Sequence, residues 1–221
     1  MHLTTLLAFL ANLATLASAS PILPSSFGLS HPLLPRTTLS AADIILKIMP
    51  TSDSCTGATG AHASDCRTNV QAAPYLIASL LHYNLTAPPQ IAALLALIGY
   101  ESSDLKYKHN ISPGRAGQGT SAMLMPDNVA AYAASIPELK DEVAAAAGDV
   151  SKVLELVVGD EYNFGAGAWW LTAVCGRGVV EGLAEGASDA AWGAYMGCVG
   201  VSATDEGRLA YWGRAKEAFG L

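Results

Sequence analysis

The sequence predicts a mostly α-helical protein with a single globular domain, and three observations support this class. The chain has 221 residues, of which 51% are hydrophobic and only 14% are charged, so it can bury a sizeable core. The alternation of apolar and polar residues that is typical of half-buried strands is nearly absent. Apolar residues recur instead at helical spacing, behind Ser, Asp and Pro residues that favour helix starts.

Composition divides the chain into three parts. Residues 1–19 resemble a secretory signal, because a short apolar run ends in an A-x-A cleavage pattern. Residues 20–38 are rich in Pro and Ser and lack periodicity, which indicates a linker or a propeptide. Residues 39–221 form the predicted domain. No later segment reaches about 18 apolar residues, so we expect a secreted, extracellular protein without stable membrane association.

Helix signals follow one another through the first half of the domain. The pattern SAAD at residues 40–43 is a capping box, and it precedes the apolar run IILKIM. A second helix is predicted at 69–83, with an interruption near Pro74. Pro88 favours the start of a third helix, which continues to Glu101.

The second half begins with a glycine-rich loop at residues 106–126, in which we expect a short hairpin. A loop of this length inside a compact domain is usually functional or disordered. The helices expected after it begin at Pro126, at Pro137 (ending near Gly148) and after Asp149 or Ser151 (ending at Val158), and two more cover residues 188–199 and 203–219.

The four cysteines suit two disulfides in an oxidising compartment. Three pairings are possible, and proximity in the sequence favours Cys55–Cys66 and Cys175–Cys198. Each bond would stabilise the fold by about 3 kcal/mol in the chain-entropy model. Zinc is the rival interpretation of these cysteines, but no CxxC or His-x-x-x-His pattern accompanies them.

Composition and motifs argue against several classes of protein. The formal net charge is −7 with no basic patch, so we expect no nucleic-acid partner. Walker A, G-x-G-x-x-G and nucleophile-elbow patterns are all missing. We therefore expect a monomer with no cofactor and no metal, in which carboxylates carry the chemistry. Glycosylation sequons begin at Asn84 and Asn110 and fit a secreted protein.

Glu101 is the carboxylate that the helical pattern singles out. At about 100° per residue it falls on the same side of its helix as Leu94, Ile98 and Leu105. A carboxylate within an apolar stripe loses solvent, which raises its pKa and favours the neutral form that a general acid needs. The alternative is that Glu101 ends the helix and reaches water, since charged residues are seldom buried.

Three short segments carry a resemblance to a known family: Glu101-Ser102, the stretch GQGTSAMLMP at residues 117–126, and YNFG at residues 162–165. In order and spacing they resemble the lysozyme-like superfamily, in particular goose-type lysozymes and lytic transglycosylases, and most closely secreted fungal muramidases. The resemblance covers residues 39–221 and implies a lysozyme-like fold, α+β with a minor hairpin. One departure is Met123, which stands where the family has a glutamine, while Gln118 lies nearby in another register.

The resemblance implies a secreted glycoside hydrolase that cleaves MurNAc–GlcNAc linkages of bacterial peptidoglycan, with Glu101 as the general acid. A second carboxylate stays open among Asp104, Asp127, Asp160 and Glu161. The residues expected to bind the sugar are Ser102, Gln118, Gly119, Thr120, Met123, Tyr162 and Asn163.

Two alternatives stay open beside this hypothesis. One is a chitosanase-like or lytic-transglycosylase activity on an aminosugar polymer; the negative net charge suits chitosan better than an anionic wall. The other is a non-catalytic secreted protein, a carbohydrate-binding or effector protein. All versions share an aminosugar polysaccharide, peptidoglycan or chitosan, as the partner.

Overall fold

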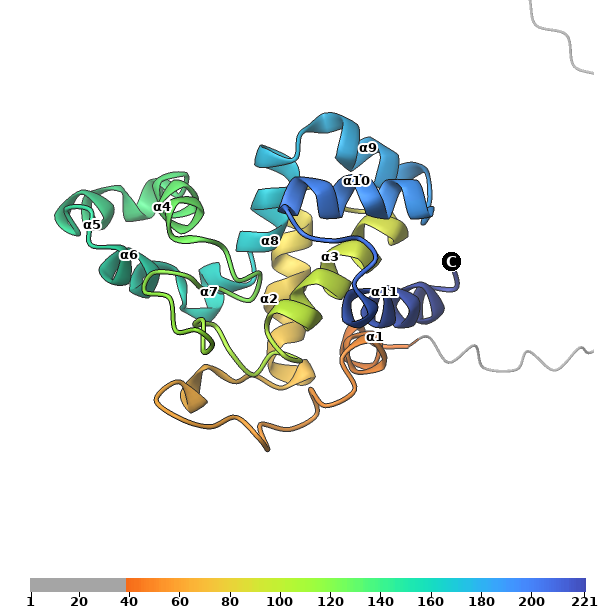
Figure 1. Ribbon diagram of the computed structural model, residues 1–221, viewed down its shortest axis with the longest axis horizontal. Helices are drawn as coiled ribbons and strands as arrows, with labels where there is room; N and C mark the ends of the chain where they lie inside the picture. The colour runs from red at the N-terminus through yellow and green to blue at the C-terminus, as the bar shows by residue number, and fades with distance from the viewer. Residues whose placement is uncertain (1–38) are drawn as a thin grey trace, which may run out of the picture. The chain divides into compact units, whose positions relative to one another are not determined.

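Helix α3, Pro88–Glu101, lies at the centre of the structure, a computed structural model that describes residues 39–221 (Figure 1). Ten of the helix's residues are buried, so it is enclosed on all sides and its apolar surface is wider than the predicted stripe. Helices α1 (Ala41–Ile48), α9 (Arg177–Glu185) and α11 (Glu206–Phe219) pack against it, α11 most extensively.

The described part of the chain is mostly helical, as predicted, and forms one compact unit. The predicted signal and linker, residues 1–38, lie outside the described residues, so the division of the chain stays a prediction. The remaining α-helices are α2 (Asn69–His82), α4 (Pro126–Ala134), α5 (Lys140–Ala145), α6 (Val150–Val157), α7 (Asp160–Asn163), α8 (Ala166–Trp169) and α10 (Asp189–Val199). Short turns are η1 (Ala63–Asp65) and η2 (Pro137–Leu139), both 3₁₀, and the π-helical η3 (Trp170–Val174).

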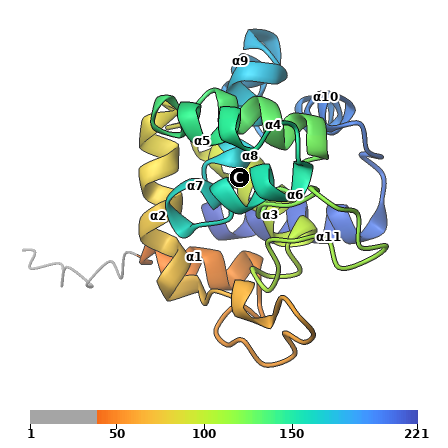
Figure 2. The same cartoon turned by 90° about the vertical axis from the view of Figure 1, so that its left-hand side faces the viewer.

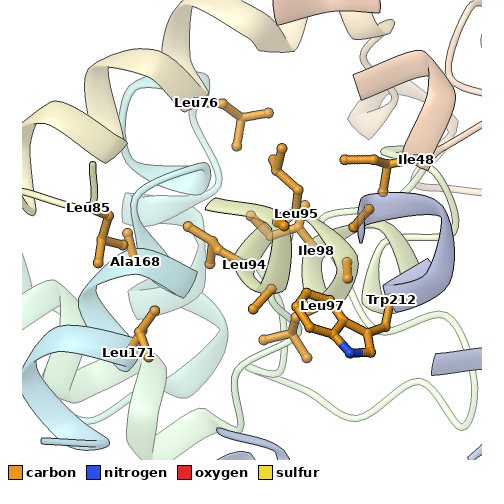
Figure 3. Close-up of a cluster of buried hydrophobic side chains, with 14 of the residues drawn as sticks. Ile48, Leu76, Leu85, Leu94, Leu95, Leu97, Ile98, Ala168, Leu171 and Trp212 are labelled. Atoms are coloured by element: carbon orange, nitrogen blue, oxygen red, sulfur yellow. The ribbon is translucent and has the colours of Figure 1, made fainter. Parts of the chain in front are cut away.

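Two apolar clusters hold these helices together. The larger one surrounds α3 and contains Leu94, Ile98 and Trp212 (Figure 3). The smaller one lies among helices α4, α6 and α8. Helices α4, α5 and α6 lie together to the left of α3 in Figure 1, and they face the viewer in Figure 2. Phe164 belongs to the larger cluster and Trp169 to the smaller one, so the segment that carries α7 and α8 joins the two.

Local sequence signals account for most helix starts. The capping box at Ser40 is present, with both of its reciprocal hydrogen bonds. Pro88 and Pro126 stand at the first positions of α3 and α4, where a missing N–H does no harm. Asp149 and Ser188 accept backbone hydrogen bonds at the starts of α6 and α10.

The structure differs from the predicted helices in several places. Helix α2 continues through Pro74 without interruption, because Val70, whose carbonyl loses its helical partner there, is exposed to water. The helix expected from Pro137 is a 3₁₀ turn followed by α5. Helix α9 was not expected, because its two glycines lower the helix propensity of a short segment, although Val179, Val180 and Leu183 recur at helical spacing.

The predicted hairpin is reduced to two isolated antiparallel bridges, His109 with Gly119 and Gly119 with Leu124. The described residues contain no β-strand, so the lysozyme-like α+β part of the predicted fold is not confirmed. None of the helices within residues 39–221 has the length and apolar character that crossing a bilayer would require.

The two predicted disulfides are confirmed. Cys55 bonds Cys66 and closes the loop before α2, and Cys175 bonds Cys198 and joins the end of η3 to α10. Both are local, so each constrains a neighbouring pair of segments and leaves the contact between α3 and α11 to side-chain packing.

That contact depends on Gly99, and we expect Gly99→Ala to lower the free energy of unfolding by about 1–3 kcal/mol, the range for overpacking. A Cβ there would lie 2.7 Å from the ring of Tyr211 and 2.9 Å from Met49. Gly193→Ala is the matched control, because it lies in α10 with nothing within 4 Å of its Cβ. Urea denaturation should show the control unchanged or slightly stabilised; equal loss in both would contradict the packing argument.

Candidate functional site

A cleft of about 780 Å³ opens at the C-terminal end of α3. Its wall combines the last turn of α3 with residues from the 103–112 segment, Met123, and Tyr211 on α11. Most of its lining side chains carry hydroxyl, carboxyl or amide groups. Residues far apart in the sequence therefore meet around one carboxylate, that of Glu101.

Glu101 is the last residue of α3, and its side chain is 17% exposed. Burial raises the pKa of its carboxyl above the ordinary value of a glutamate, and the nearby positive charge of Arg208 only partly offsets that effect. Both sequence interpretations therefore hold in part: Glu101 ends the helix, yet it lies in a desolvated position. A carboxyl group of this kind can donate a proton or a hydrogen bond at mildly acidic pH.

Arg208 on α11 is the residue that faces Glu101. One guanidinium nitrogen lies 2.6 Å from Oε1 of Glu101, and the Arg208 side chain is 11% exposed. Its guanidinium also stacks on Tyr100, 4.3 Å from the ring centre. Nearby, burial raises the pKa of the Tyr195 hydroxyl, and the charge of Glu101 adds to that shift. The carboxyl is thus enclosed by one cation and by aromatic rings.

Asp104 lies on the cleft wall but is 4% exposed and has hydrogen-bond partners on both carboxylate oxygens. Oδ2 accepts from the backbone N–H of Thr51 at 2.9 Å and from its hydroxyl at 2.8 Å. Oδ1 accepts from the hydroxyl of Tyr211 at 2.5 Å. Asp104 therefore joins the segment after α1 to α11, and it does not stand free to activate a water molecule.

The other predicted carboxylates are not brought to this cleft. Asp127 is exposed in the first turn of α4. Asp160 pairs with Arg67 at 2.7 Å and with Lys108 at 2.5 Å, and these partners lower the pKa of its carboxyl against the opposing effect of burial. Glu161 lines a separate pocket with Tyr162.

Several predicted binding residues have their polar groups engaged inside the protein. The hydroxyl of Ser102 donates to the carbonyl of Ile98 and accepts from the N–H of Leu105, and the residue is fully buried. Gly119 is packed so closely that a Cβ would lie 2.4 Å from the carbonyl oxygen of Lys108. Thr120 is fully buried, and its hydroxyl has no partner among the described residues.

The remaining predicted residues divide between different places. Met123 lies on the cleft wall, while Gln118 lines a neighbouring groove and donates to the carbonyl of Met123. Asn163 is buried and accepts from the N–H of Ser121, which fixes the glycine-rich loop to α7. Tyr162 lies in the pocket with Glu161. Only part of the predicted binding set therefore surrounds Glu101.

The sequence analysis missed the residues that complete the cleft, chiefly Arg208 and Tyr211. They lie on α11, more than 100 positions after Glu101, and no local pattern links them to it. The neighbouring groove, of about 340 Å³, contains His62 and His109, which together with Asp65 form a group of possible metal ligands. The sequon residue Asn84 is exposed, whereas Asn110 accepts two backbone hydrogen bonds through its amide oxygen.

Comparisons with known proteins give limited matches. No protein-family model matches the chain, and no solved structure matches it. Among curated proteins, a relative from Fusarium oxysporum (strain Fo5176) is named bifunctional dioxygenase (DOX)-epoxy alcohol synthase (EAS). It is 40% identical over 159 residues, which are 68% of this chain and 12% of the relative. The chain therefore spans a small part of that longer protein.

This relative contradicts the resemblance to the lysozyme-like superfamily and to fungal muramidases. The predicted glycosidase function was therefore wrong, together with its alternatives and the terms hydrolase and muramidase. The physical reason is that the resemblance depended on three segments of two to ten residues. In the structure Ser102 and Asn163 have internal bonding roles, and Tyr162 lies in a separate pocket.

We expect Arg208→Met to raise the pKa of Glu101 further, because the variant keeps the burial and removes the cation. A raised pKa means that protonated Glu101 stabilises the fold fully below the ordinary glutamate pKa, and that this contribution is lost as pH rises through the raised pKa. Carbon NMR of the carboxyl group measures the titration directly. Arg177→Met, at an exposed position on α9, is the control and should leave it unchanged. A lower pKa in Arg208→Met would contradict the assigned cause.

We expect Asp104→Asn to lower the free energy of unfolding by about 1–3 kcal/mol. The two oxygens of Asp104 accept from three donors, whereas the amide of asparagine has one oxygen and an NH2 group that cannot accept. Asp127→Asn, at an exposed position, should change stability by less than about 0.5 kcal/mol. Denaturant unfolding of both variants tests the difference. Equal stability of Asp104→Asn and the parent would show that the network contributes nothing.

Proposed function

We propose that this chain binds an oxygenated compound of the epoxy alcohol class in the Glu101 cleft, and that Glu101 carries a proton to or from an oxirane oxygen. The observation that carries the proposal is the desolvated carboxyl of Glu101, with its raised pKa, on the wall of an open cleft. A neutral carboxyl donates to an ether or hydroxyl oxygen, and both groups occur in an epoxy alcohol.

Proton transfer is what this chemistry needs from a protein. An oxirane opens more readily when its oxygen receives a proton, and the same group takes the proton back when the ring closes. In an epoxy alcohol the substrate's own hydroxyl can attack the neighbouring oxirane carbon, which moves the ring without adding or removing atoms. Glu101 gives its proton to the opening oxirane oxygen, and the proton of the attacking hydroxyl returns to the Glu101 carboxylate, so the reaction is an isomerisation that restores the neutral carboxyl.

The lining of the cleft suits a ligand with a carbon chain and a few oxygens. Met123 and Ile111 offer apolar surface, and Tyr100, Tyr107 and Thr51 carry hydroxyl groups. The Arg208 guanidinium stays beside Glu101, where it can stabilise the carboxylate that remains after proton donation. The ligand class comes from the name of the Fusarium relative, and the proton donor comes from the geometry of the cleft.

We also propose that the chain acts as a monomer in an oxidising, extracellular compartment, where its two disulfides are stable. The relative is far longer than this chain, which matches 12% of its length. In this proposal the present domain acts on a compound that dioxygenase and epoxy alcohol synthase activities make or use.

The test is incubation of the purified chain with an aliphatic epoxy alcohol, followed by NMR of the oxirane protons. Glu101→Gln keeps the size of the side chain and cannot donate a proton, so conversion should fall by about 10²–10⁴-fold. Glu161→Gln, outside the cleft, should convert the compound as the parent does. No binding by the parent, or equal conversion by folded Glu101→Gln, would refute the proposal.

A further inference from the structure

Three side chains with metal-binding groups meet at the groove beside the cleft. His62, Asp65 and His109 each present one ligand atom, and these atoms all lie within 4.8 Å of one another. Both histidines line the groove, whereas Asp65 is buried beneath them. None of the three is the proton donor proposed above, although His109 also lines the Glu101 cleft.

A short helical turn, a disulfide and backbone hydrogen bonds hold these groups in place. His62 precedes the 3₁₀ turn η1 and Asp65 ends it, and side chains three residues apart lie on one face of such a turn. The following residue, Cys66, is held by its disulfide. Asp65 Oδ2 accepts from the backbone N–H groups of Lys108 and His109 at 3.0 and 3.1 Å, which fixes His109 against the turn.

The ring of His109 lies between two carboxylates. Its Nδ1 is 2.8 Å from Asp65 Oδ2, and its Nε2 is 3.0 Å from Glu155 Oε1 on α6. A neutral imidazole carries one proton. On Nδ1 the proton donates to Asp65; on Nε2 it donates to Glu155 and leaves the lone pair of Nδ1 free to bind a cation. A carboxylate that orients a metal-bound histidine through its other nitrogen is a common arrangement.

His62 supplies the observation that points to a ligand. Its ring stacks on that of His109 at 4.0 Å between centres, and among residues 39–221 no hydrogen bond to either of its ring nitrogens is present. His62 therefore has an unused ring lone pair close to the ligand atoms of a second imidazole and of a carboxylate. We propose that His62, Asp65 and His109 bind one divalent transition-metal ion of zinc-like chemistry, with Glu155 as the positioning residue of His109.

The donor set favours zinc over the hard cations. Two imidazole nitrogens and one carboxylate oxygen are typical of zinc sites that keep one position open, while Mg²⁺ and Ca²⁺ prefer oxygen ligands alone. Ligand distances of about 2.0–2.2 Å put tetrahedral ligand atoms about 3.3 Å apart. The longest of the present separations therefore has to close by about 1.5 Å, which rotation of the half-buried His62 can supply, and the 2.8 Å contact between His109 Nδ1 and Asp65 Oδ2 has to open by about 0.5 Å. The open position would face the groove of about 340 Å³.

Calorimetric titration of the full chain with Zn²⁺, after removal of metals by a chelator, tests this site. We expect one zinc ion per chain and no comparable binding of Mg²⁺. His62→Ala should weaken zinc binding by more than the roughly 10–100-fold expected for Glu155→Gln, the loss typical of an orienting residue. His62 is the decisive position, because its ring touches the 109 segment by stacking on His109 alone, and the variant should keep its circular dichroism spectrum.

His82→Ala is the matched control, since His82 is exposed on α2 and has no part in the cluster. It should bind zinc as the parent does. Substitution of Co²⁺ for Zn²⁺ gives a second readout, because a tetrahedral site with nitrogen ligands produces a visible absorption band that His62→Ala would lose. Absence of zinc binding by the parent, equally tight Mg²⁺ binding, or unchanged affinity in folded His62→Ala would overturn the proposal.

Discussion

The carboxylate of Asp104 joins its own segment, which follows α3, to two others, and the rest of the cleft depends on this connection. Through Thr51 it holds the chain after α1, and through the hydroxyl of Tyr211 it holds α11. Tyr211 can reach it only because Gly99 leaves room for the aromatic ring against α3. Since α11 also carries Arg208, this buried network fixes the cation that faces Glu101. Asp104, a candidate catalytic carboxylate in the sequence, thus has a structural role, because its hydrogen bonds hold other groups in place.

Glu101 itself shows how a helix end creates a reactive carboxyl. Helix α3 is buried over nearly its whole length, so its last side chain leaves the core and meets solvent only partly. Desolvation raises the pKa, and the Arg208 cation opposes it without cancelling it. An unopposed cation would have left the carboxylate permanently charged, whereas a fully buried group could not exchange protons with a ligand. The cleft keeps the residue between these limits.

Helix starts and disulfides could be predicted from the sequence because both depend on neighbours in the chain. Ser40, Pro88 and Asp149 each act within one helical turn, and the paired cysteines are close in sequence. The site could not be predicted to the same extent, because Glu101 gains its surroundings from α11, which only tertiary packing brings near. The short motifs misled for a related reason: buried Ser102 and Asn163 stabilise backbone turns, a use that is common to many folds.

The 106–119 segment links the cleft to the histidine groove. His109 lines both, and its backbone pairs with Gly119, where any side chain would strike the carbonyl of Lys108. Lys108 is buried and bonded to Asp160, which in turn holds Arg67 beside the disulfide of Cys66. Burial lowers the pKa of Lys108, and the carboxylate of Asp160 opposes that shift. The Asp160 carboxylate therefore favours the charged form of the buried Lys108. One backbone segment, fixed by a buried charge pair, therefore sets the geometry of the proton donor's cleft and of the proposed metal site together.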